Sequence, residues 1–231
     1  LSLTASPAAA APDWHADGKA MLGDVIAIPS VSTRPAEVKR LVAYLKGRYE
    51  AAGIPDVRVK DHDGTQSMII RWPAAGKAKA KPILLLGHMD VVDAKPEDWS
   101  KDPFKMVEEG GYLYGRGTVD MKNGIVAISN ALFRLKAEGF KPKRDIIILF
   151  TGDEETDGTG ANHAATEWRK EVDADFALNA DAGGGGFTKD GASLGFGLQT
   201  AEKMYQSFHF TARNPGGHSS RPRPDNAIYD L

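Results

Sequence analysis

The chain contains no cysteine among its 231 residues, which excludes disulfide bonds, thiolate metal sites and catalysis by a thiol. Its 29 basic residues nearly balance 31 acidic ones, so the formal net charge of −2 provides no basic field for nucleic acid or an anionic membrane. No apolar run approaches the ~20 residues that a membrane-spanning helix requires. We therefore expect an ordinary globular protein with no nucleic-acid or membrane partner.

The N-terminal segment is rich in alanine and proline. Residues 8–10, three consecutive alanines, resemble the cleavage pattern of a secretory signal peptide. We expect residues 1–14 to be a signal-peptide remnant or a linker. The first interpretation predicts a periplasmic or secreted protein, and the second leaves a cytoplasmic location as the alternative.

Patterns typical of helices and of strands alternate along the chain. Helical periodicity covers residues 17–28, 36–52 and 122–136. Short apolar runs typical of strands cover residues 57–59, 67–70, 83–86, 146–150 and 176–179, and the last three are expected to be buried. A loop and hairpin are expected over residues 99–117. The alternation predicts an α/β domain, a mostly parallel sheet with helices on both faces.

The pattern changes after about Thr200. Phe208 and Phe210 alternate with polar residues, as on one face of a strand, and residues 214–218 form a turn motif. We expect one domain over residues 15–199, and residues 200–231 to be the start of a second, truncated α+β domain.

One histidine and several carboxylates lie at the ends of the apolar runs or, in one case, just before a helix. They are His88, Asp90, Asp120, Glu154, Glu155 and Asp181. Because the carboxyl ends of parallel strands meet in one crevice, we expect these side chains to converge. So many acids at one point need a cation, and oxygen ligands with one imidazole suit zinc, cobalt or manganese.

Four of these six residues also have an ordinary structural explanation. Asp120 could cap the helix that it precedes, and Glu154 and Glu155 could be solvated surface acids. His88 could be a core histidine bonded to a nearby carboxylate. Asp153, directly after an apolar strand, adds a further acid whose burial is costly without a cation.

Five motifs occur in the order found in a known enzyme family. They are residues 87–92, residues 115–122, residues 153–155, Asp181 and residues 217–220. Over about residues 17–231 the chain resembles the co-catalytic zinc metallopeptidase family. That family includes aminoacylase, glutamate carboxypeptidase, acetylornithine deacetylase, succinyl-diaminopimelate desuccinylase and carnosinase-type dipeptidases.

The resemblance implies two divalent cations, zinc first, with cobalt or manganese as alternatives. It implies that His88 and Asp181 bind one ion, that Asp120 bridges both, and that Glu155 binds the other. A further histidine ligand is expected later in the chain, beyond residue 231.

The resemblance also implies catalytic roles. Glu154 would be the general base, Asp90 would orient His88, and His218 would stabilise an oxyanion from a lid domain. Residues 15–199 would then be the catalytic domain and residues 200–231 the start of the lid/dimerisation domain, through which a homodimer forms.

The implied function is hydrolysis of a peptide or amide bond in a small substrate by a metal-activated water. Asp181 stands where deacylases and carboxypeptidases of the family usually have glutamate, which favours a dipeptidase or aminopeptidase. An N-acyl amino acid deacylase or carboxypeptidase is the alternative. A non-catalytic metal-binding homologue is disfavoured because Glu154 is retained, and a nucleotide-binding protein is disfavoured because no glycine fingerprint follows the first strand.

Overall fold

The computed structural model of the chain describes residues 12–181, 184–201, 203–204, 206–218, 220–221, 224–229 and 231. The alanines at 8–10, on which the signal-peptide prediction depends, lie outside the described residues. The chain divides into two compact units, residues 1–183 and residues 184–231. This division precedes the boundary expected at residue 200 because β8 (Gly184–Phe187) and β9 (Ser193–Gly197) pair with each other in a separate two-stranded sheet.

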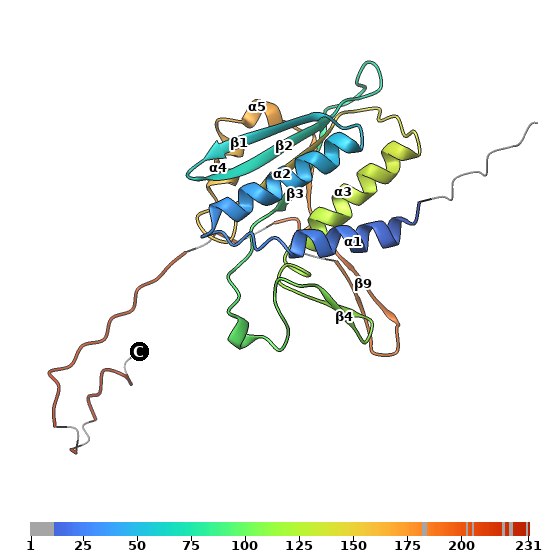
Figure 1. Ribbon diagram of the computed structural model, residues 1–231. Coiled ribbons are helices and arrows are strands. Elements are labelled where there is room, and N and C mark those ends of the chain that lie inside the picture. Colours follow the sequence, from blue (N-terminus) through green and yellow to red (C-terminus); the bar gives the residue numbers. More distant parts are fainter. Residues whose placement is uncertain are drawn as a thin grey trace, which may run out of the picture. The chain divides into compact units, whose positions relative to one another are not determined.

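Unit 1 is built on a five-stranded sheet with the strand order β1-β2-β6-β3-β7 (Figure 1). The strands are β1 (Asp56–His62), β2 (Thr65–Trp72), β3 (Ile83–His88), β6 (Ile146–Thr151) and β7 (Phe176–Asn179). β6 and β7 both run parallel to β3, whereas β2 runs antiparallel to its neighbours β1 and β6. All strands except β2 therefore run in one direction, which confirms the mostly parallel sheet.

Helices cover both faces of this sheet (Figure 1). The face formed by alternate residues such as Ile70 and Ile148 packs against α1 (Trp14–Ile26), α2 (Pro35–Ala51) and α3 (Lys122–Ala137). The opposite face, with Ile69, Ile147 and Leu149, packs against residues of α4 (Thr159–Ala165) and α5 (Arg169–Val172). Neighbouring residues of a strand point to opposite faces, so a strand apolar throughout, such as β6, fits a sheet covered on both sides. The α/β prediction is confirmed.

A small hairpin lies between β3 and α3. It consists of β4 (Val107–Glu109) and β5 (Tyr112–Tyr114), which follow a short 3₁₀ helix, η1 (Pro96–Asp98). The loop and hairpin expected over residues 99–117 are thus confirmed.

Two expectations about strands are wrong. β7 forms as predicted but is not buried, since Phe176 is 49% and Leu178 is 52% exposed. The reason is its position as the last strand of the sheet. The strand expected at Phe208 and Phe210 does not form: the described residues after Gly197 contain no strand, and both rings are exposed. A strand needs a pairing partner, and none lies beside this segment among the described residues.

Candidate metal centre

The predicted site residues of unit 1 gather at one edge of the sheet. His88 is the last residue of β3 and pairs in register with Thr151 at the end of the parallel strand β6. Glu154 and Glu155 follow β6, Asp181 follows β7, and Asp120 lies just before α3. Because β3, β6 and β7 are parallel, the segments that follow them emerge at the same edge, as the sequence predicts.

His88 lies at the middle of this group and is only 2% exposed. Its Nδ1 is 3.0 Å from the main-chain oxygen of Asp90, which can accept a hydrogen bond from the Nδ1–H group. Its Nε2 is 2.9 Å from Oδ1 of Asp120, 3.6 Å from Oδ1 of Asp181 and 3.8 Å from Oε2 of Glu154. One ring nitrogen is thus held by the backbone while the other faces three carboxylates, the usual arrangement of a metal-binding histidine.

Asp90 is fully buried and fastens the loop after β6. Its carboxylate accepts hydrogen bonds from the main-chain N–H groups of Glu154, at 3.1 Å, and Glu155, at 3.0 Å, and from the Ser32 hydroxyl at 2.7 Å. The same carboxylate lies 3.5 Å from Nδ1 of His88. Burial would raise the pKa of Asp90, but the interactions with His88, Ser32 and the Glu155 N–H outweigh burial and lower it. Asp90 therefore stays ionised and sets the positions of both glutamates.

The crowding of acids perturbs the ionisation of the group. Burial alone would lower the pKa of His88, yet Asp90, Asp181 and Glu154 together raise it to about 9. Burial raises the pKa of Glu154, and the charges of Asp181, Asp90 and Asp120 raise it further against the opposing effect of His88. Burial and the charge of Asp120 likewise raise the pKa of Glu155. The group is thus short of positive charge.

The ligand chemistry fits a divalent cation. Among the described residues, no lysine or arginine forms an ion pair with Asp120, Glu154, Glu155 or Asp181. Potential ligand atoms lie within 4.8 Å of one another in two overlapping sets, one of His88, Glu154 and Asp181 and one of His88, Asp120 and Glu155. Carboxylate oxygens with an imidazole nitrogen, in two adjacent sets, suit zinc or a similar ion.

Two supporting residues were missed from the sequence. Lys122, at the start of α3, is completely buried, and its Nζ donates to the main-chain oxygens of Val25 at 2.8 Å and Ile28 at 2.6 Å. Burial lowers the pKa of Lys122 to about 7. Lys122 ties the end of α1 to the segment that carries Asp120. Its signal in the sequence was its place as the last residue of the motif over residues 115–122. Ser32, which binds Asp90, gave no signal, since the two lie 58 residues apart.

Asp153 does not belong to the acidic group, contrary to the expectation that its burial needs a cation. Its carboxylate accepts hydrogen bonds from the Thr159 hydroxyl at 2.6 Å and from the Gly160 N–H at 3.1 Å. The hydrogen bonds of the buried Asp153 carboxylate are therefore supplied by the first two residues of α4, and no cation is needed. A Cβ at Gly160 would lie 2.9 Å from Oδ1 of Asp153, so glycine is required for this close approach.

His218 belongs to unit 2, where the Ser220 hydroxyl lies 2.8 Å from its Nδ1. The role expected for it stays a prediction.

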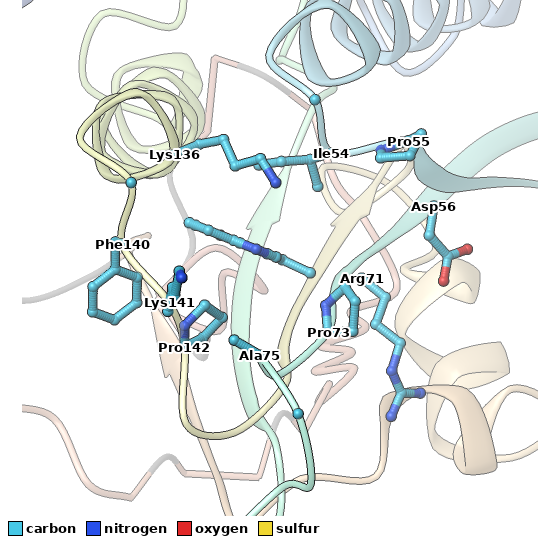
Figure 2. Close-up of a pocket in the computed structure, with 14 residues that line it drawn as sticks. Ile54, Pro55, Asp56, Arg71, Pro73, Ala75, Lys136, Phe140, Lys141 and Pro142 are labelled. Atoms are coloured by element: carbon cyan, nitrogen blue, oxygen red, sulfur yellow. The ribbon is translucent and has the colours of Figure 1, made fainter.

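Figure 2 shows a surface cavity of unit 1, whose volume is about 870 Å³. It is lined by Arg71 at the end of β2, by Pro73 just after that strand, and by Phe140, Lys141 and Pro142 before β6 (Figure 2). Trp72 pairs with Ile146, the first residue of β6, which places this cavity near the amino ends of β6 and β3. None of the clustered acids lines it.

The fold and the site together define an α/β domain with a candidate metal centre at the carboxyl edge of its sheet. The family described as Peptidase family M20/M25/M40 matches residues 84–218, more than half of the chain. The chain therefore belongs to this peptidase family, which confirms the resemblance seen in the sequence.

Individual relatives agree with the family assignment. The chain is 32% identical over 214 residues to a probable succinyl-diaminopimelate desuccinylase of Staphylococcus aureus, covering 91% of this chain and 48% of the relative. Human carnosine dipeptidase 1 has a similar structure, with a TM-score of 0.62 and 21% identity over 74% of this chain and 41% of that one. A metallo-carboxypeptidase of the M20 family from Sulfolobus solfataricus gives a TM-score of 0.65 and 22% identity over 76% of this chain and 39% of that one. The chain thus spans about half the length of the desuccinylase, and less of the two solved structures.

The described helices include none with the length and apolar character needed to cross a bilayer.

Proposed function

We propose that this chain carries most of the metal-binding and catalytic residues of a metal-dependent hydrolase that cleaves a peptide or amide bond in a small substrate. The observation that carries the proposal is the convergence of four carboxylates on His88, with no lysine or arginine paired to them among the described residues. An acidic group without compensating side chains is costly unless a cation neutralises it. Membership of the peptidase family supports the same conclusion.

We assign the ligands of two divalent cations, zinc in the first place. His88 and Asp181 would bind one ion, Asp120 would bridge, and Glu155 would bind the other. The position of Asp120 supports a bridge, because its carboxylate is 2.9 Å from Nε2 of His88 and also belongs to the set that contains Glu155. A second histidine ligand would come from a later part of the full-length protein.

When bound, the cations would supply a water of lowered pKa and a Lewis acid for the substrate carbonyl. Glu154 would take the proton of that water and pass it to the leaving amine. Its raised pKa favours this role, since a general base works best with a pKa close to the working pH. Asp90 would hold Glu154 in place through the hydrogen bond from the Glu154 N–H.

The remaining proposals concern the whole protein. His218, in the lid/dimerisation domain that would begin near residue 200, would stabilise the tetrahedral oxyanion, and a homodimer would form through that domain. A periplasmic or secreted location is proposed from the alanine-rich N-terminal segment, with the cytoplasm as the alternative.

For the substrate we favour a free dipeptide, with a dipeptidase or aminopeptidase activity, because of Asp181. The structurally similar carnosine dipeptidase supports the proposal only at the level of the fold. An acylated amino acid is the second candidate, favoured by the 32% identity to a probable succinyl-diaminopimelate desuccinylase.

The test is turnover by the zinc-loaded full-length protein on matched dipeptides and their N-acetylated forms. Faster hydrolysis of the free dipeptides would support the favoured substrate, and faster hydrolysis of the acetylated forms would establish the alternative. The hydrolase proposal fails if neither set is cleaved while two equivalents of zinc are bound, since that result is expected of a non-catalytic metal-binding homologue.

A further inference from the structure

A second histidine–carboxylate cluster lies outside the acidic group of the candidate metal centre. It consists of His62 at the end of β1, Asp63 in the turn to β2, and His163 on α4. One potential ligand atom from each residue lies within 4.8 Å of the other two. No residue of this cluster belongs to the candidate metal centre.

The orientation of His62 is fixed by burial and by one hydrogen bond. Its side chain is 1% exposed, and its Nε2 is 2.7 Å from the Ser67 hydroxyl. Its Nδ1 therefore faces the turn, 3.7 Å from Oδ2 of Asp63 and 3.2 Å from the hydroxyl oxygen of Thr159. In the Nε2–H tautomer the Ser67 hydroxyl oxygen accepts a hydrogen bond from His62, and the lone pair of Nδ1 is available for a ligand bond.

His163 approaches the same carboxylate from the helix. Its Nε2 is 2.9 Å from Oδ2 of Asp63, and its Nδ1 is 3.1 Å from Oε1 of Glu167. An imidazole with one nitrogen held by a carboxylate and the other facing a potential ligand position is the arrangement that orients metal-binding histidines. In His62, Nε2 is held by Ser67 and Nδ1 faces Asp63. In His163, Nδ1 is held by Glu167 and Nε2 faces Asp63.

The spacing suits a small tetrahedral ion. Ligand bonds of about 2.0–2.2 Å place neighbouring ligand atoms ~3.3–3.6 Å apart in a tetrahedral site. The two distances to Oδ2 of Asp63, 2.9 Å from Nε2 of His163 and 3.7 Å from Nδ1 of His62, lie on either side of this range. The side chains of Asp63 and His163 are 57% and 25% exposed, so solvent can reach the cluster and supply a fourth ligand. An ion pair between His163 and Asp63 explains those two residues alone. The alternative for His62 is a hydrogen bond from Nδ1–H to the Thr159 oxygen, because the Thr159 hydroxyl donates its own hydrogen to Asp153, and in that tautomer Nδ1 binds no metal.

We propose that Nδ1 of His62, Nε2 of His163 and the Asp63 carboxylate bind one divalent transition-metal ion of the zinc type, at a site separate from the candidate catalytic centre. Three protein ligands and an exposed fourth position define the site. Binding requires neutral His163, with its remaining ring proton on Nδ1 facing Glu167. It also requires His62 as the Nε2–H tautomer, with the Ser67 hydroxyl accepting the hydrogen bond from Nε2–H.

Trp168 provides a local reporter of this site. Its ring stacks on His163 with 5.2 Å between ring centroids, and it lies 5.4 Å from the ring of His62. Ni²⁺ bound between the two histidines would quench the fluorescence of Trp168. The experiment titrates the chelator-treated full-length protein with Ni²⁺ alone and follows both tryptophan fluorescence and the number of equivalents bound by calorimetry.

Saturable quenching is expected in the wild-type protein and in His15→Ala, a control that removes an exposed histidine from α1. His163→Ala should lose the quenching and one bound equivalent. Glu167→Gln, which keeps all three ligands but removes the carboxylate beside Nδ1, should weaken binding about 10–100-fold. Trp168→Phe should remove the saturable quenching and keep the bound equivalent.

Equal stoichiometry and quenching in His163→Ala and the wild type would overturn the proposal and leave an ion pair only. Misfolding is a separate question, answered by the melting curve of each variant. Glu167→Gln keeps the proposal testable if His163→Ala does not fold, because unchanged Ni²⁺ affinity in Glu167→Gln would then contradict the arrangement proposed here.

Discussion

The two ends of the central sheet carry the same kinds of acidic residue in opposite electrostatic situations. At the amino end, Asp145 immediately precedes β6 and lies 2.6 Å from Nη2 of Arg71, while Asp175 immediately precedes β7 and lies 3.0 Å from Nη1 of Arg144. At the carboxyl end, the acids after the same two strands meet His88 but no lysine or arginine partner among the described residues.

The pKa directions follow this contrast. Burial would raise the pKa of Asp145, but the Ala74 N–H and Arg71 outweigh burial and lower it. The pKa of Glu154 is raised by burial and by its acidic neighbours. Paired acids therefore stabilise the fold by themselves, whereas the unpaired acids lower its stability until a cation binds. The lack of a lysine or arginine partner thus separates the acids at the carboxyl end of β6 and β7 from those at the amino end.

The largest effect is expected from Glu154→Gln in the full-length protein. The amide cannot accept the proton of the attacking water, so turnover should fall about 10²–10⁴-fold while the bound zinc is retained. Turnover on the preferred substrate and metal analysis of the same sample would measure both quantities. Glu97→Gln, in the surface turn η1, is the matched control and should leave turnover unchanged.

Loss of zinc from Glu154→Gln with turnover largely kept would make Glu154 a ligand and not the base. The set of His88, Glu154 and Asp181 makes this a real alternative outcome.

At the amino end, Asp145→Asn should affect stability instead of turnover. The wild-type carboxylate accepts from Arg71 Nε and from the Ala74 N–H, both at 2.8 Å, so the substitution should cost about 1–3 kcal/mol in the free energy of unfolding at pH 7. Urea unfolding measures this difference. Asp175→Asn, where the carboxylate is half exposed, is the control and should cost less than about 1 kcal/mol.

The pH dependence of the Asp145 effect has a definite sign. The folded pKa of Asp145 is lowered, so its stabilisation is present above the ordinary pKa of about 3.9 and is lost as the pH falls through the lower folded value. The difference between wild type and Asp145→Asn should therefore shrink as the pH is lowered through this range. A difference that stays constant down to pH 2 would show that the ion pair is not its cause.

Short-range patterns in the sequence predict the acidic end of the sheet and much less of the amino end. Apolar runs locate β3 and β6, and the parallel arrangement then places His88 beside the glutamates. The pairing of Arg71 with Asp145 joins residues 74 apart, and no local pattern specifies it. The same limit explains why Ser32 was missed: it contacts Asp90 only because residues 30–32 lie against residues 89–91 in the folded domain.

The smallest effect, and the most direct test of the contrast, is expected from Glu155→Gln in protein treated with a chelator. Burial and the charge of Asp120 raise the pKa of Glu155, so its charge opposes folding once the pH exceeds the ordinary value near 4.5. Replacing it with glutamine should stabilise the metal-free protein at pH 7 by less than about 1 kcal/mol, because the side chain is partly exposed and water screens its charge.

Zinc should reverse the order of stability of the wild type and Glu155→Gln. A ligand that binds only the folded state raises its melting temperature, and the rise is larger the more tightly the ligand binds. Glu155→Gln would lose a ligand oxygen while retaining the size of the side chain. Calorimetric melting with and without zinc should therefore show the variant more stable than wild type without the ion and less stable with it. If the variant is as stable as wild type both with and without zinc, Glu155 is an ordinary surface acid. The cation would then be bound by His88, Asp120 and Asp181.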